Sequence, residues 1–192
     1  MFTNEQLQAM IRKERISEQY PYSENDDEVL VDYLKPLLVE LTRLKIRYRM
    51  ESDHFGSGYA SYIQLFCYTD DFMKVTEKDG ERQEVRRGLH VLVSRLAPVL
   101  IIGNAWEGAS FAQSGKQTGA SYSMLDNPSE LIIEPQFTEL YNDLEQLFMK
   151  YHFTFLRKED VEPPLPFDAH IPTLSRSKGK YLVWDAIFYW ED

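Results

Sequence analysis

The sequence predicts an α+β fold with a largely antiparallel sheet of about five to seven strands packed with two or three helices. Helical patterns stand at the start of the chain and once near its end, and runs of strand patterns lie between them. The 12 Tyr and 11 Phe favour a sheet-rich interior, because aromatic rings pack well on a pleated surface. The 192 residues suit one domain with a full core, so we expect residues 1–192 to form a single globular unit.

The first two elements are predicted to be helices. Thr3 and Gln6 form a capping-box pattern before apolar residues at helical spacing, which predicts a helix over residues 4–18. The acids at 26–28 then favour the positive end of a second helix. Its buried stripe comprises Leu30, Leu34, Leu37, Leu38 and Leu41. Because Pro36 interrupts this stripe, we expect a kink there or two short helices.

The middle of the chain changes to the two-residue period of strands. Residues 44–50 alternate between apolar and basic side chains, and residues 59–68 are typical of a long strand rich in aromatic residues. The pair Asp79-Gly80 between two strand patterns is a strong hairpin signal. Residues 89–96 and 99–102 are apolar on both faces, which indicates central strands or a strand bent at Pro98. The exceptions within this run are His90, Ser94 and Arg95.

Residues 103–130 are rich in Gly, Ser, Ala and Gln and predict a long loop, a feature that is usually functional or mobile. Pro135 then opens a third helix, in which apolar residues recur at spacings of three and four up to Tyr151. A short strand at 153–156 and a proline-marked connector follow. The chain ends in an apolar and aromatic segment, residues 180–192. We expect this segment to be a packed strand that closes the fold, since its rings would lose a large burial term in water.

Composition limits the classes of partner. The 21 basic and 31 acidic residues give a net charge of −10, which repels phosphate backbones, so we expect no nucleic-acid binding and favour a basic partner. Cys67 is the only cysteine, so no disulfide forms within the chain. The polar N-terminus lacks the pattern of a signal peptide, and no apolar stretch is long enough to span a bilayer. We therefore expect a cytoplasmic protein without a membrane segment.

Two motifs resemble reaction or cofactor sites. Residues 114–119 resemble a phosphate loop, but Ser110 and Gln117 stand where that motif needs glycine and a hydroxyl residue. Asp53, His54 and Ser57 supply the ingredients of nucleophilic catalysis, although neighbours on a tight loop seldom align as a triad. We interpret that segment as an exposed turn.

The histidines are widely separated, with no pair at the spacing that places two ligands on one helix face. They are His54, His90, His152 and His170. We therefore predict no catalytic residues, no cofactor and no metal site.

Acidic clusters occur together with aromatic residues that cannot all be interior. Aromatic anchors ringed by charge are typical of protein interfaces. The residues that we select on this ground as partner-binding are Trp106, Glu107, Trp190, Glu191 and Asp192.

Two short segments carry a resemblance to other proteins. Residues 92–98 (LVSRLAP) and 184–192 (WDAIFYWED) resemble stretches of uncharacterised small acidic bacterial proteins, some of which serve as immunity proteins beside secreted toxins. The resemblance covers about a tenth of the chain and implies no site residues. With the charge and the absence of a catalytic motif, it favours a non-enzymatic, cytosolic, protein-binding domain of immunity type.

Two alternatives remain open. The first is an enzyme or small-ligand-binding protein with a pocket under the 103–130 loop, lined by Trp106, Glu107, Asp53 and His54. The second is a structural subunit whose C-terminal strand pairs with the sheet edge of a neighbour. The sequence fixes neither the oligomeric state nor the strand order.

Overall fold

A seven-stranded sheet forms the centre of the computed structural model, which describes residues 2–56, 58–78, 80–173 and 176–191. Its main strand order is β1-β3-β5-β6-β7, with β4 paired to β5 and β8 paired to β6. All pairings are antiparallel except that of β6 with β8. The strands are β1 (Arg47–Glu51), β3 (Tyr62–Tyr68), β4 (Met73–Lys78), β5 (Glu81–Ser94), β6 (Val99–Phe111), β7 (Gln117–Tyr122) and β8 (Thr154–Phe155). The predicted fold class is confirmed.

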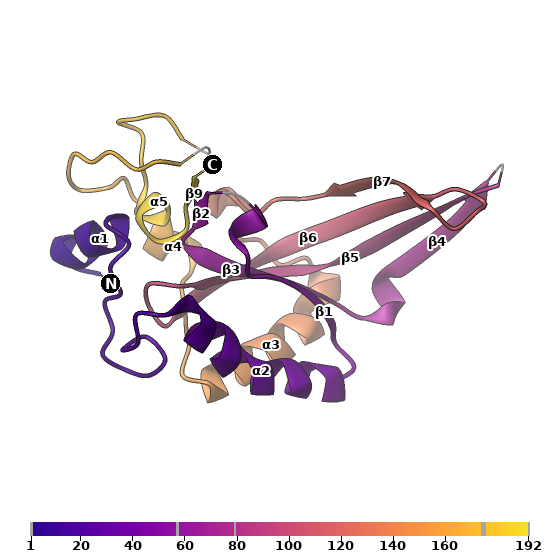
Figure 1. Cartoon of the computed structure of the whole chain (residues 1–192), viewed down its shortest axis with the longest axis horizontal. Coiled ribbons are helices and arrows are strands. Elements are labelled where there is room, and N and C mark those ends of the chain that lie inside the picture. Colours follow the sequence, from indigo (N-terminus) through magenta and orange to yellow (C-terminus); the bar gives the residue numbers. More distant parts are fainter. Residues whose placement is uncertain (1, 57, 79, 174–175, 192) are drawn as a thin grey trace.

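The long strands β5 and β6 run from a helix-covered body into a projecting arm. Each changes its outer neighbour along its length: β5 pairs with β3 in the body and with β4 further out, and β6 pairs with β8 and then with β7. The arm therefore consists of β4, β7 and the parts of β5 and β6 between them. Figure 1 shows it extending to the right, beyond all the helices.

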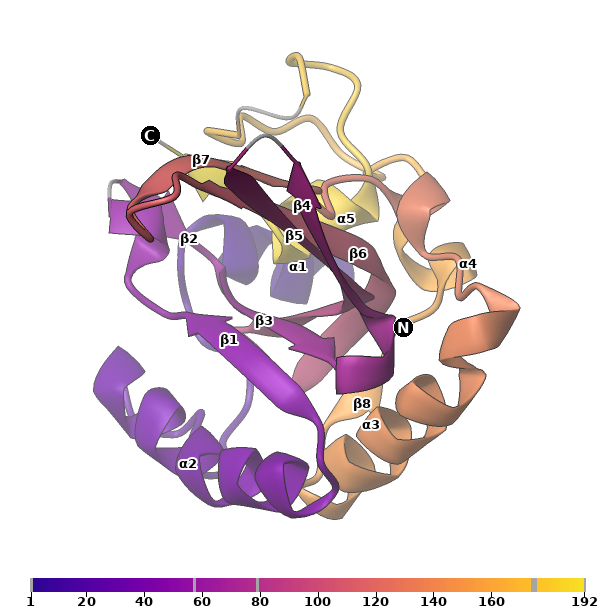
Figure 2. The ribbon, with the colours of Figure 1, turned by 90° about the vertical axis from the view of Figure 1, so that its right-hand side faces the viewer.

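Helices cover both faces of the sheet in the body. On one face lie α2 (Asp27–Arg43) and α3 (Thr138–Lys150), whose leucines pack on Ile63, Val91 and Leu100. On the other face lie α1 (Asn4–Ile11), α4 (Lys158–Val161) and α5 (Val183–Ile187), which pack on Leu92 and Ile101. Figure 2 shows these two layers below and above the curved sheet. Alternate residues of the central strands thus enter different cores, which is why these strands are apolar on both faces.

Two glycines allow close approaches that position these parts. A Cβ on Gly88 would lie 2.1 Å from the carbonyl oxygen of Cys67, at the point where β5 leaves β3. A Cβ on Gly103 would lie 2.7 Å from the side chain of Leu125 and 2.8 Å from the carbonyl oxygen of Glu130. The chain after β7 can therefore cross directly over β6 and fill the space there.

The two N-terminal helices differ in extent from the prediction. The first ends at Ile11 instead of residue 18, because Lys13 turns into the left-handed region and the N–H of Ile16 donates to the carbonyl oxygen of Leu96, just after β5. The second is a single helix through Pro36, and the expected division into two helices was wrong. Pro36 is exposed, so water can bond the carbonyl group that loses its partner.

The prediction of a long loop at residues 103–130 was also wrong. β6 continues to Phe111, and β7 returns beside it with an irregularity between Ser110 and Phe111. Gly, Ser and Ala have little intrinsic preference for strands. The long strand β5 nevertheless offers β6 hydrogen-bonding partners as far as Phe111, and this pairing outweighs the weak preference.

The C-terminal segment is buried, as expected, but it does not enter the main sheet as a strand. It forms the helix α5 and then β9 (Trp190–Glu191), which pairs with β2 (Tyr59–Ala60) in a separate two-stranded sheet. The backbone N–H of Leu182 donates to the carboxylate of Asp185 at 2.7 Å, an N-terminal cap that favours the helix. The predicted single strand over 59–68 is divided at Ser61, whose N–H donates to the carbonyl oxygen of Tyr189.

Candidate functional site

The residues selected from the sequence do not form one surface. Trp106 and Glu107 are successive residues of β6, so their side chains project from opposite faces of the sheet. Trp106 is 43% exposed, whereas Glu107 is 7% exposed. Trp190 and Glu191 form β9 at the body, and Asp192 lies outside the described residues.

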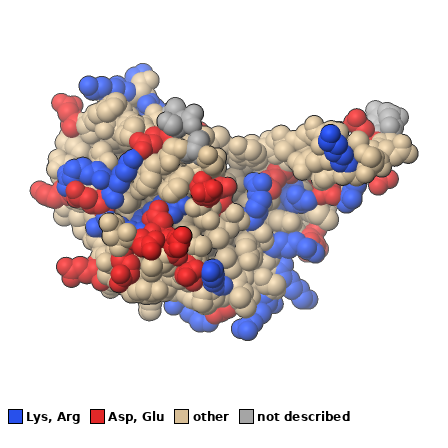
Figure 3. Space-filling model, viewed as in Figure 1, with Lys and Arg blue, Asp and Glu red and all other residues tan. Residues whose placement is uncertain are grey.

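An acidic surface surrounds the start of α2. It consists of Asp26, Asp27, Glu28, Glu51 and Asp53, which come from the first turn of α2 and the end of β1. The Asp26 carboxylate caps the helix by accepting from the N–H of Glu28 at 2.9 Å. In Figure 3, acidic side chains gather over this region, and basic side chains lie nearer the base of the arm.

Buried arginines hold this surface together. Arg95 Nη1 lies 3.0 Å from Asp27 Oδ2, and Arg95 Nη2 donates to the carbonyl oxygen of Ser52 at 2.7 Å. Arg15 Nη2 lies 2.5 Å from Asp27 Oδ1. Burial lowers the pKa of Arg95, and the charge of Asp27 opposes that shift. Arg95, which follows β5, therefore links the two segments that carry the acids through an ion pair with Asp27 and a hydrogen bond to Ser52.

Aromatic side chains adjoin the acids through the short helical turn at His54–Gly56. The Phe55 ring lies 5.2 Å from the Trp190 ring, and the His54 ring stacks on Tyr59 at 5.3 Å. Glu191 forms an ion pair with Lys13. The C-terminal pair Trp190 and Glu191 thus lies beside the acidic surface, whereas Trp106 and Glu107 belong to the arm.

His54 does not bridge Asp53 and a hydroxyl group in the part of the chain that is described. Its Nδ1 accepts from the N–H of Ala60 at 3.0 Å, and its Nε2 lies 3.7 Å from Asp27 Oδ2. The N–H of Asp53 instead donates to Glu51 at 2.7 Å. Ser57 lies outside the described residues. The acid that faces His54 is therefore Asp27, a residue absent from the motif that the sequence suggested.

The remaining histidines and the cysteine are not placed as a metal centre. Burial lowers the pKa of His90 to about 4 and raises the pKa of Cys67 to about 12. Neither ring nitrogen of His90 has a hydrogen-bond partner among the described residues. Across residues 2–56, 58–78, 80–173 and 176–191, no group of three or more His, Cys, Asp or Glu side chains could hold a metal ion.

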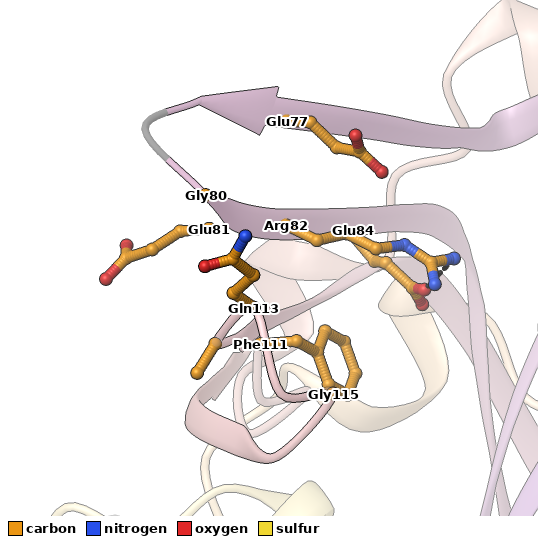
Figure 4. A pocket seen from close by; sticks show the side chains of 9 residues that line it. Glu77, Gly80, Glu81, Arg82, Glu84, Phe111, Gln113 and Gly115 are labelled. Carbon is orange, nitrogen blue, oxygen red and sulfur yellow. Dashed lines mark ion pairs between the residues drawn. The ribbon is translucent and has the colours of Figure 1, made fainter.

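The arm has two open depressions on the face that carries Glu107. One, of about 220 Å³, is lined by Arg49, Arg86, Glu107 and Tyr122 among others. The other, of about 600 Å³, lies at the tip, where Figure 4 shows Glu77, Arg82, Glu84 and Phe111 around it. Glu107 is the one residue of the predicted pocket lining that borders either depression; Trp106, Asp53 and His54 border neither.

Ion pairs neutralise part of the charge in these depressions. Arg49 Nη2 lies 2.5 Å from Glu107 Oε1, and Glu84 forms ion pairs with Arg82 and Arg86. Burial raises the pKa of Glu107, and Arg49 and Arg86 oppose the shift. These ion pairs make the depressions a polar contact surface.

Comparison of the chain with protein family models, with curated proteins and with solved structures gave no match. None of the helices in the described residues combines the length and apolar character needed to cross a membrane.

Sequence reasoning missed Arg15, Arg95 and Asp27 as the residues that organise the acidic surface. Arg95 did carry a signal, because an arginine in an otherwise apolar strand needs an acidic or carbonyl partner when it is buried. Phe55 carried none, since its contact with Trp190 joins segments that are far apart in the sequence.

Proposed function

We propose that this protein is a non-enzymatic, cytoplasmic binding protein that recognises a basic protein partner through the acidic surface and the adjoining rings of Phe55 and Trp190. The observation that carries the proposal is the convergence of acids and aromatic side chains from three distant segments, residues 26–28, 51–55 and 190–191, beside one helix start. Aromatic anchors provide contact area, and surrounding acids steer a basic partner and set its orientation.

The distribution of charge supports this choice of surface. Residues 73–122, which include the arm, contain seven of the 21 Lys and Arg residues and five of the 31 Asp and Glu residues. The rest of the chain therefore holds 14 basic and 26 acidic residues. A basic partner would be attracted to the body and not to the arm.

An immunity protein is the specific form of this function that we propose, in a bacterial host. Such a protein would neutralise a toxin by covering its surface, and this mode needs no catalytic residue in the covering protein. The gene for the toxin should then lie next to the gene for this chain, so the product of the adjacent gene is the partner to test.

The test is calorimetric titration of that purified product into the wild-type chain and into the triple variant Asp26→Asn, Glu28→Gln and Asp53→Asn. These three side chains are exposed, and Asn preserves the cap at position 26. We expect the triple variant to bind at least about tenfold more weakly, because three rim charges together contribute about 1.4 kcal/mol or more.

The matched control removes three exposed acids elsewhere on the body, Glu139→Gln, Glu159→Gln and Asp168→Asn. It has the same net charge as the triple variant and should bind within about threefold of wild type. Equal weakening of both variants, or no binding by the wild-type chain, would contradict the proposed surface.

A further inference from the structure

We propose that the arm pairs two copies of this chain through the outer edge of β7, which joins antiparallel to β7 of the second copy and makes one sheet continuous across both. This inference concerns the arm and is independent of the partner proposed for the acidic surface.

The first step is the exposure of the β7 edge. β7 pairs with β6 on one side and ends the strand order of the sheet, and all six of its residues are exposed. The N–H of Ser123 donates to the carbonyl oxygen of Trp106 in β6 at 2.9 Å. Along β7, successive residues then direct their backbone groups alternately toward β6 and away from it. Ala120 and Tyr122 therefore direct their backbone N–H and C=O groups away from β6, ready to pair with another strand.

The second step is the lack of charge on β7. The other edge strands longer than two residues carry charged side chains, namely Arg47, Arg49 and Glu51 on β1 and Lys74 and Glu77 on β4. Such charges are a common protection against edge pairing. β7 has the sequence Gln-Thr-Gly-Ala-Ser-Tyr, with no charged residue and no proline, so this edge is left unprotected.

The third step distinguishes a second copy from another kind of strand. In a symmetric antiparallel pair of identical strands, a charge at the centre would face the same charge of the second copy. β7 carries no charge at any position, so a second copy can pair with it without bringing like charges together. The two bodies, which carry the acidic excess, would repel each other at close range. The arm has a small basic excess and holds the contact away from the bodies.

The register follows from the outward-facing residues. Antiparallel pairing centred on Ala120 places Ala120 opposite itself and Tyr122 opposite Thr118 of the second copy, so the outward backbone groups of Ala120 and Tyr122 are used. Tyr122 is 53% exposed and lies on the same face as Glu107. In this register its ring covers the Gln117 side of the 220 Å³ depression of the other copy.

The experiment measures the mass of the full chain by analytical ultracentrifugation from low to high micromolar concentration. We expect the wild-type chain to approach twice 22.6 kDa, and Ala120→Lys and Ala120→Pro to stay at 22.6 kDa. Lysine would place like charges on the two-fold axis, and proline removes the outward N–H without breaking a bond to β6. The matched control, Thr76→Lys, puts the same charge on the edge strand β4 and should still form dimers.

Crosslinking tests the register and remains informative if a variant changes stability. Ala120→Cys should form an intermolecular disulfide on mild oxidation, because paired strand residues lie within disulfide distance, whereas Thr76→Cys should not. A wild-type chain that remains at 22.6 kDa at all concentrations would overturn the proposal. A dimer that persists in Ala120→Lys and gives no crosslink through position 120 would overturn it as well.

Discussion

The guanidinium group of Arg95 lies 3.0 Å from the carboxylate of Asp27, which joins the end of the central strand β5 to the first turn of α2. The Arg95 side chain is 1% exposed, and the same group also donates to the carbonyl oxygen of Ser52. One buried cation therefore positions both segments that carry the acidic surface.

Replacing Arg95 by methionine should lower the free energy of unfolding by about 2–3 kcal/mol. The loss stays below that of a fully buried ion pair because the Asp27 side chain is 38% exposed and water can partly replace the contact. Urea unfolding followed by tryptophan fluorescence measures this. The control Lys35→Met removes an exposed ion pair with Asp32 and should change stability by less than about 0.5 kcal/mol. Similar values for the two variants would show that Arg95 does not organise this region.

The stability of the protein should fall as the pH drops from about 6.5 to about 4, partly because of His90. Burial lowers the pKa of His90 to about 4, and the positive charge of Arg49 adds to this shift. Between the two pKa values the unfolded chain binds a proton at this residue and the folded chain does not, so acid favours unfolding. The contribution of His90 amounts to about 3 kcal/mol across this interval.

The variant His90→Phe should lose that part of the pH dependence. Its ring fits beside Phe66, whose ring already lies 5.6 Å from His90. Urea unfolding at pH 7 and pH 4.5 for wild type, His90→Phe and the exposed-site control His170→Gln gives the comparison. If His90→Phe and wild type lose the same stability on acidification, His90 does not titrate as described.

The substitution Gly88→Ala should destabilise the fold by about 2 kcal/mol or more, because the new Cβ would overlap the carbonyl oxygen of Cys67. Gly119→Ala is the matched control in β7, where the nearest atom to a Cβ is 3.8 Å away. We expect the control to remain within about 0.5 kcal/mol of wild type. Thermal unfolding followed by circular dichroism compares them, and a tolerant Gly88 would mean that β5 can leave β3 without this close approach.

Local sequence signals predicted the elements whose geometry is set by neighbouring residues. The pair Asp79-Gly80 indicated the β4–β5 hairpin, and the apolar stripe after Pro135 indicated α3. The continuous apolar runs around His90 and Ile101 likewise indicated the central strands, because both faces of these strands enter a core.

The features that the sequence did not predict depend on contacts between distant segments. The arm forms because β5 offers a long pairing edge to a segment of weak strand preference, and α5 forms because Asp185 caps it while Trp184 is buried beneath. The candidate site likewise depends on contacts between segments that are far apart in the sequence. Trp190 was selected from the sequence as a partner-binding residue, which stays a prediction, and the acids that it adjoins follow from the packing of Phe55 and Asp27.

The central claim is that a protein partner covers the start of α2, and hydrogen-exchange mass spectrometry with the adjacent-gene product tests it most directly. Amide exchange should slow in peptides spanning residues 24–30, 51–56 and 188–191 when the partner is added, with little change in residues 73–122. Slower exchange confined to residues 73–122, or unchanged exchange throughout the body in a complex that demonstrably forms, would contradict the account.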